Sequence, residues 1–183
     1  MRRAPLLGLI VLLLLAPQAC GYSLLGRGIV VDPTIKRVGV PLVKDHTGKA
    51  GLDEKITSKV SQELLKRTGY AVVQETTGVD ALVEVELLAY TANPVGFSEE
   101  AARSLATTAT ATTASRYALV LTARVKYLKV GQTEPIWSSE SFTARDEWDI
   151  GDASSYFDRE EQALERVSTE FARGLVATML EAF

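Results

Sequence analysis

The chain has 183 residues, with 20 lysines and arginines against 23 aspartates and glutamates, a formal net charge of −3. This length is enough for one domain with a hydrophobic core. The sequence has no run of basic residues that would neutralise the phosphates of DNA or RNA, so composition argues against a nucleic-acid partner.

The first twenty residues have the pattern of a lipoprotein signal. Two arginines precede an apolar run, Leu6–Leu15, which is shorter than the roughly 20 residues that a membrane span needs. Cys20, the only cysteine, follows a small residue and has no disulfide partner. We therefore expect residues 1–19 to be removed and Cys20 to be acylated as a membrane anchor. Pro17 departs from the leucine usual at its position, which leaves an ordinary signal peptide with a chance cysteine as the alternative.

After a glycine-bearing tether at residues 20–33, the sequence predicts a strand over Ile35–Val40 and a polar loop over Lys44–Gly51. A helix follows, because apolar residues recur every four positions from Leu52 to Leu64. Its first turn is acidic, its last turn is basic, and Gly69 is expected to end it.

Four further strands are predicted, over Tyr70–Gln74, Ala81–Tyr90, Tyr117–Leu128 and Ile136–Ala144, the last with a continuation towards Trp148. In Ala81–Tyr90 and Tyr117–Leu128, apolar and polar residues alternate, which is typical of antiparallel strands with one solvent-exposed face. If the two pair, Glu84 and Glu86 are expected to meet Arg124 and Lys126 across the strands.

A last helix is predicted from about Tyr156 to Phe183, with its apolar side formed by Leu164, Val167, Phe171, Leu175 and Leu180. The resulting order predicts an α+β two-layer sandwich. Two helices would pack on one face of a mostly antiparallel sheet of four to five strands, within a single domain over residues 34–183.

The segment Ala101–Ser115 is rich in alanine and threonine and carries one charge, Arg103. One interpretation is a loop. The other is that both flanking strands extend into a projecting hairpin around residues 91–116, which suits threonine-rich strands exposed on both faces.

No motif for catalysis or for a cofactor is present. His46 is the only histidine, so a zinc site lacks ligands, and we interpret His46 as a solvated turn residue. The sequence has neither a phosphate-binding glycine loop before a helix nor a nucleophile elbow. The adjacent acids Glu160 and Glu161 are interpreted as part of a solvated face. We therefore predict no enzyme activity, no cofactor and no metal site.

Several short motifs resemble, in order and spacing, the lipopolysaccharide-assembly lipoproteins of the LptE family. They are Cys20–Leu24, Thr34–Pro41, Asp45–Gly48, Gly51–Thr57, Leu65–Val73, Val79–Leu82, Arg116–Tyr117 and Ile136–Trp137. Each motif is degenerate alone. The alanine- and threonine-rich segment departs from the family pattern.

The resemblance implies a lipoprotein of the outer membrane. Gly21, rather than an aspartate, follows the expected lipidated cysteine, which by resemblance to Gram-negative lipoproteins also favours the outer membrane. Members of the family plug the β-barrel that exports lipopolysaccharide, are needed for its assembly, and help to deliver lipopolysaccharide to the cell surface. Cations on the second long strand, Arg116, Arg124 and Lys126, are then candidates for contact with lipopolysaccharide phosphates.

The alternative is an outer-membrane lipoprotein that acts as an interaction or regulatory domain for a cell-wall synthase or a secretion pore, without binding lipopolysaccharide. The projecting hairpin separates the two, because a plug needs a protrusion and a compact activator does not.

Overall fold

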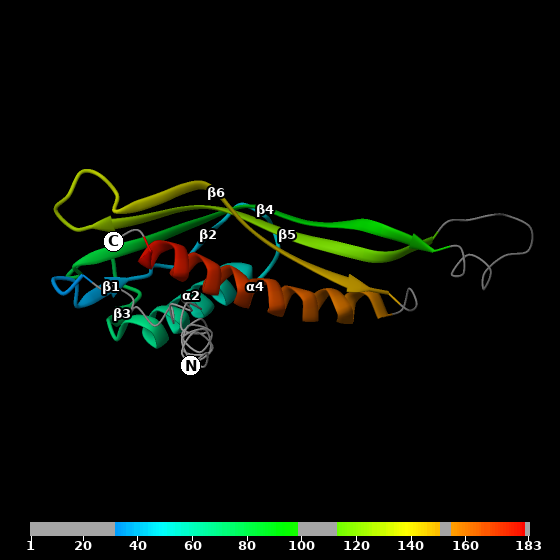
Figure 1. The fold of residues 1–183 in the computed structure, drawn as a ribbon, viewed down its shortest axis with the longest axis horizontal. Helices are drawn as coiled ribbons and strands as arrows, with labels where there is room; N and C mark the ends of the chain where they lie inside the picture. Colours follow the sequence, from blue (N-terminus) through cyan, green and yellow to red (C-terminus); the bar gives the residue numbers. More distant parts are fainter. Residues whose placement is uncertain (1–31, 99–112, 151–154, 182–183) are drawn as a thin grey trace, which may run out of the picture.

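The computed structural model describes residues 32–98, 113–150 and 155–181. These residues form two helices and six strands (Figure 1), whose bounds are β1 Arg37–Gly39, β2 Lys44–Asp45, α2 Leu52–Thr68, β3 Ala71–Val73, β4 Ala81–Ser98, β5 Thr113–Lys129, β6 Trp137–Asp149 and α4 Tyr156–Leu180.

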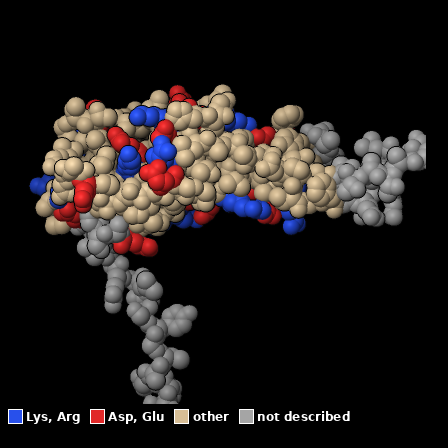
Figure 2. Space-filling view, turned by 90° about the horizontal axis from the view of Figure 1, so that it is seen from above, with Lys and Arg blue, Asp and Glu red and all other residues tan. Residues whose placement is uncertain are grey.

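The strands form one sheet in the order β3-β1-β4-β5-β6, and β2 pairs with β4 outside this path. The long pairs β4–β5 and β5–β6 are antiparallel, whereas the short β1 and β2 run parallel to β4, and β3 runs parallel to β1. Both helices lie on one face of the sheet (Figure 1), and neither covers the opposite face, which is seen in Figure 2. We call this second surface the helix-free face.

The α+β class and the placement of both helices on one face are therefore confirmed. The long strand pairs are antiparallel, as predicted, and the short parallel strands make the sheet mixed. The sheet has six strands where four to five were predicted, because β2 falls within the expected polar loop. A two-residue polar strand gives no hydrophobic alternation, so only its backbone pairing with β4 defines it.

Helix α2 follows its sequence signals. Asp53 and Glu54 lie in the first turn, Lys66 and Arg67 in the last, and Gly69 ends the helix with φ 69°. That left-handed conformation favours glycine because other residues meet steric strain there. Helix α4 begins as predicted and is described to Leu180, with all five predicted apolar positions buried.

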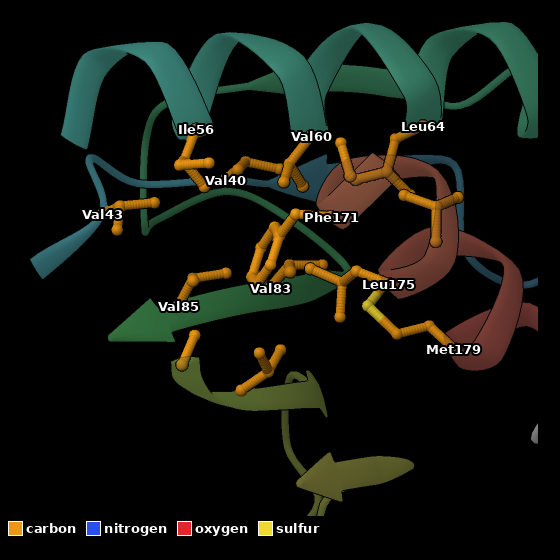
Figure 3. Close-up of a cluster of buried hydrophobic side chains, with 14 of the residues drawn as sticks. Val40, Val43, Ile56, Val60, Leu64, Val83, Val85, Phe171, Leu175 and Met179 are labelled. Carbon is orange, nitrogen blue, oxygen red and sulfur yellow. The ribbon is translucent and has the colours of Figure 1, made fainter. Parts of the chain in front are cut away.

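The hydrophobic core lies between the helices and the sheet, as Figure 3 shows. Alternate β4 residues such as Val83 and Val85 point towards the helices, and α4 contributes Phe171, Leu175 and Met179. The same alternation places the charged residues of β4 and β5 on the helix-free face.

Strands β4 and β5 extend past Tyr90 and Tyr117, the limits of the alternating patterns, and continue beyond the ends of β6 and α4 (Figure 1). Their pairing contains register shifts between Leu87 and Ala89 and around Gly96, where the alternation is interrupted. Strand β5 begins at Thr113, so the end of the alanine- and threonine-rich segment is strand. The rest of that segment lies outside the described residues.

Candidate functional site

Charged side chains of both signs gather on one part of the helix-free face, over β4, β5 and β6 (Figure 2). Two of the three predicted ligand-contact residues, Arg124 and Lys126, belong to this cluster because they alternate with buried residues of β5. Arg116 lies apart, towards the projecting end of the hairpin, opposite Gly96 on β4 and Asp149 on β6.

Arg124 is held between two carboxylates. Its Nη1 lies 2.8 Å from Oε2 of Glu86, and its Nε lies 2.6 Å from Oε2 of Glu140. These hydrogen bonds, with Glu140 the stronger cause, raise the pKa of Arg124, and the bond from Arg124 lowers the pKa of Glu86. The predicted contact between Glu86 and Arg124 is confirmed, while the Glu140 partner comes from β6 and was not expected.

Lys126 behaves differently. It lies opposite Glu84 in the β4–β5 register, as predicted, yet no ion pair joins them within the described part of the chain. That half of the prediction is wrong. Both side chains are exposed, and an exposed pair gains too little Coulomb energy to hold two long side chains in one geometry. Lys126 therefore keeps all three ammonium donors available.

His46 is more than a solvated turn residue, although its side chain is largely exposed. Its Nε2 lies 2.9 Å from Oε1 of Glu86, and its backbone N–H donates to the carbonyl of Leu87. His46 thus gives Glu86, one of the two carboxylates that bind Arg124, a second side-chain partner. Among the residues that the structure describes, no group of histidine, cysteine, aspartate and glutamate is arranged to hold a metal ion.

The cluster borders a pocket of about 580 Å³ on the helix-free face. Its lining joins the segment after β1, the turn after β3 and the outer side of the three long strands; the residues are Pro41, Leu42, Lys44, Thr76, Glu84, Val85, Glu86, Arg124, Lys126 and Glu140. Sequence reasoning missed Lys44. Only the β2–β4 pairing, which puts Lys44 opposite Glu86, places it here.

Arg116 forms an ion pair with Asp149, with Nε 2.8 Å from Oδ1. This hydrogen bond raises the pKa of Arg116. The pair joins β5 to the last residue of β6, so Arg116 has a structural partner as well as an exposed position.

One buried polar group also departs from the sequence interpretation. Glu160 is 8 % exposed, and its Oε1 accepts hydrogen bonds from Lys49, 3.0 Å away, and from the hydroxyl of Tyr90. Glu161, by contrast, is exposed as expected. Glu160 thus ties the loop before α2 to the start of α4, and the expectation of a solvated face is wrong for this residue.

The predicted signal peptide, residues 1–19, and the predicted lipidation site, Cys20, lie outside the described residues. Neither helix in the described part of the chain is both long and apolar enough to cross a bilayer.

Comparison with curated protein sequences found no match. Solved structures, in contrast, share the fold. An uncharacterized lipoprotein B from Nitrosomonas europaea has a TM-score of 0.51 at 13 % identity, covering 88 % of this chain and 96 % of its own. The rare lipoprotein B from Shewanella oneidensis has a TM-score of 0.50 at 11 % identity, with coverage of 79 % and 94 %. The hypothetical protein CT253 from Chlamydia trachomatis has a TM-score of 0.52 at 11 % identity, with coverage of 81 % and 97 %.

At these identities the structures establish the fold alone. The sequence model of the lipopolysaccharide-assembly family LptE matches residues 35–179, which include all six described strands, α2, and α4 except its last residue. The chain belongs to the lipopolysaccharide-assembly family LptE.

Proposed function

We propose that this protein is a non-enzymatic lipoprotein of the outer membrane that assembles with the lipopolysaccharide export barrel, plugs it, and assists delivery of lipopolysaccharide to the cell surface. In this proposal residues 1–19 are removed and Cys20 is acylated, so that the domain is anchored on the periplasmic side. The observation that carries the proposal is the family match over residues 35–179.

The surface of the described residues is consistent with a plug. The lumen of a large barrel is polar, and both layers of this domain have polar exposed sides. On the helix side, Lys55 and Lys59 of α2 form ion pairs with Glu161 and Glu165 of α4. On the other side lies the cluster around Arg124. The extension of β4 and β5 past α4 supplies the protrusion that a plug requires and a compact activator does not (Figure 1).

Among the proposed contacts with lipopolysaccharide phosphates, Lys126 is the strongest candidate because no carboxylate engages it within the described residues. Arg124 and Arg116 each donate to carboxylates. A phosphate would have to compete with these ion pairs.

Co-purification tests the partner. The full chain, extracted in detergent from outer membranes, should bring down a large β-barrel in roughly equal amount, and depletion of the chain should reduce the folded barrel and surface lipopolysaccharide. A barrel that assembles normally without the chain would contradict the proposal. Replacing Cys20 with Ala removes the proposed acylation site and should release the chain from the membrane.

Lipopolysaccharide contact is tested separately with purified lipopolysaccharide and the full chain. Lys126→Glu should weaken binding roughly tenfold if the ammonium makes a charge-assisted bond to phosphate. Lys66→Glu, an exposed lysine at the end of α2 on the other layer, makes the same charge change and should leave binding unaltered.

A further inference from the structure

The pocket on the helix-free face contains three charged groups without an ion-pair partner. Lys44, Lys126 and Glu84 all line it, and within the described residues none of them forms an ion pair. The pocket's other charges are already satisfied, because Arg124 is shared between Glu86 and Glu140. Two ammonium groups and one carboxylate therefore remain to bind a ligand.

The balance of basic and acidic side chains in the pocket limits what the ligand can be. The lining contains three basic and three acidic side chains, so a group carrying only negative charge would meet Glu84, Glu86 and Glu140 as well as the lysines. A ligand with both signs satisfies the free groups together. Phosphate suits two lysines, since ammonium groups are strong donors to phosphate oxygens. A primary ammonium suits a free carboxylate.

The position of the pocket also favours an amphiphile. Leu42, with more than half of its surface exposed, and Pro41 stand at the pocket beside the charged groups. An apolar part of a ligand gains free energy by covering such exposed apolar side chains while its charged part meets the charged groups beside them.

We propose that this pocket binds a zwitterionic phosphate ester, in which a phosphate and a primary ammonium are joined by a short chain, as in a phosphoethanolamine headgroup. Lys44 and Lys126 hold the phosphate, and Glu84 holds the ammonium. Arg124 engages the other two carboxylates of the pocket, Glu86 and Glu140. This inference rests on the proposed function in one respect: that function places the protein at a membrane of the cell envelope, in contact with lipids.

The test uses the full chain in an uncharged maltoside detergent and free phosphoethanolamine, inorganic phosphate and ethanolamine as probes, with binding measured by calorimetry and by NMR of labelled lysines. Phosphoethanolamine should bind, and each half-molecule should bind at least about tenfold more weakly, because each lacks one charge-assisted contact. Lys44→Glu and Lys126→Glu should each lower the affinity roughly tenfold. Lys66→Glu serves as the matched control.

Glu84→Gln separates the two ends of the ligand. It should remove the preference for phosphoethanolamine over phosphate while leaving phosphate binding in place. Equal affinity for inorganic phosphate and phosphoethanolamine, or unchanged binding by Lys44→Glu and Lys126→Glu, would overturn the proposal. Neither outcome bears on co-purification with the barrel, so failure here and failure of the proposed function are distinguishable.

Two sources share this headgroup: a glycolipid decorated with phosphoethanolamine and a phospholipid. Competition distinguishes them. Displacement of bound phosphoethanolamine by lipopolysaccharide carrying that group, but not by bicelles of phosphatidylethanolamine, assigns the pocket to the glycolipid, and the reverse assigns it to the phospholipid. Displacement by neither would contradict a role for the pocket in lipid binding.

Discussion

Arg124 on β5 donates to Glu86 on β4 across 2.8 Å, and the same guanidinium reaches Glu140 on β6, so one side chain joins the three long strands. The neighbouring Lys126 is not in an ion pair within the described residues, although it shares the same strand and face. Their neighbours on β6 differ: Lys126 lies opposite Ser138, whereas Arg124 lies at the register shift between Ala123 and Val125 and reaches Glu140. The forked guanidinium of Arg124 can then bond two carboxylates at once.

The first prediction compares these two cations. Arg124→Ala should lower the urea midpoint of unfolding, because it leaves two carboxylates facing each other across β5, whereas Lys126→Ala should leave the midpoint almost unchanged. The difference should shrink in about 1 M salt, where the Debye length is about 3 Å. Equal midpoints for the two variants at low salt would show that Arg124 contributes no stability.

A second prediction concerns the core at Phe171, which is fully buried and packs edge-on against Phe142 of β6 with ring centroids 5.2 Å apart. Phe171→Ala should lower the free energy of unfolding by about 3–5 kcal/mol, because it removes buried apolar surface and leaves a cavity. Leu65→Ala on the exposed side of α2 should change it by less than about 0.5 kcal/mol. Urea denaturation followed by circular dichroism measures both.

The third prediction concerns the clamp between Asp32 and Lys129, whose Oδ2 and Nζ lie 2.8 Å apart at the start of the described chain. Hydrogen bonds from Lys129 and Thr34 lower the pKa of Asp32 from 3.8 to about 2. Because the folded pKa is depressed, the stabilisation is complete above pH 3.8 and is lost as the pH falls through about 2.

Two measurements check this clamp. NMR titration of the Asp32 carboxyl should give a midpoint near 2, and Lys129→Met should move it towards 3.8, whereas Lys66→Met should not. The stability difference between the native chain and Asp32→Asn should disappear over the same acid range. A midpoint at the ordinary value in the native chain would contradict the clamp.

Sequence patterns predicted the parts of this fold that repeat locally. The four-residue recurrence from Leu52 to Leu64 and the alternation from Val83 to Leu87 both reflect burial on one side, so the helix and the strand followed directly. The pattern stops at the register shift after Leu87, where an extra residue turns the alternation over. Pro94 and Gly96 further obscured the strand beyond it.

The candidate site depended on information that is not local. Lys44 reaches the pocket because β2 pairs in parallel with β4, and Glu140 reaches Arg124 because β6 pairs with β5. A single sequence does not specify either of these strand pairings. The cross-strand contact of Glu86 with Arg124 was predictable because both lie on long alternating strands, and a single assumed pairing places them opposite each other.

The last prediction concerns the buried carboxylate of Glu160. Burial alone would raise its pKa, but the hydrogen bonds from Tyr90 and Lys49 outweigh burial, and the pKa lies below its ordinary value. Removing one donor leaves Oε1 of this buried carboxylate with one hydrogen bond instead of two, so less of the cost of burying the charge is offset. Tyr90→Phe should lower the free energy of unfolding by about 1 kcal/mol, and Lys49→Met by about 1–2 kcal/mol, at neutral pH.

A double-mutant cycle distinguishes this network from packing. If Lys49 acts through the charge of Glu160, then Lys49→Met in a Glu160→Gln background should cost much less than in the native chain. The same cost in both backgrounds would mean that Lys49 stabilises the chain mainly by contact with the Tyr90 ring, whose centroid lies 5.1 Å from the ammonium. Because this group joins the loop before α2 to the start of α4, its loss should also speed amide exchange in the first turns of α4.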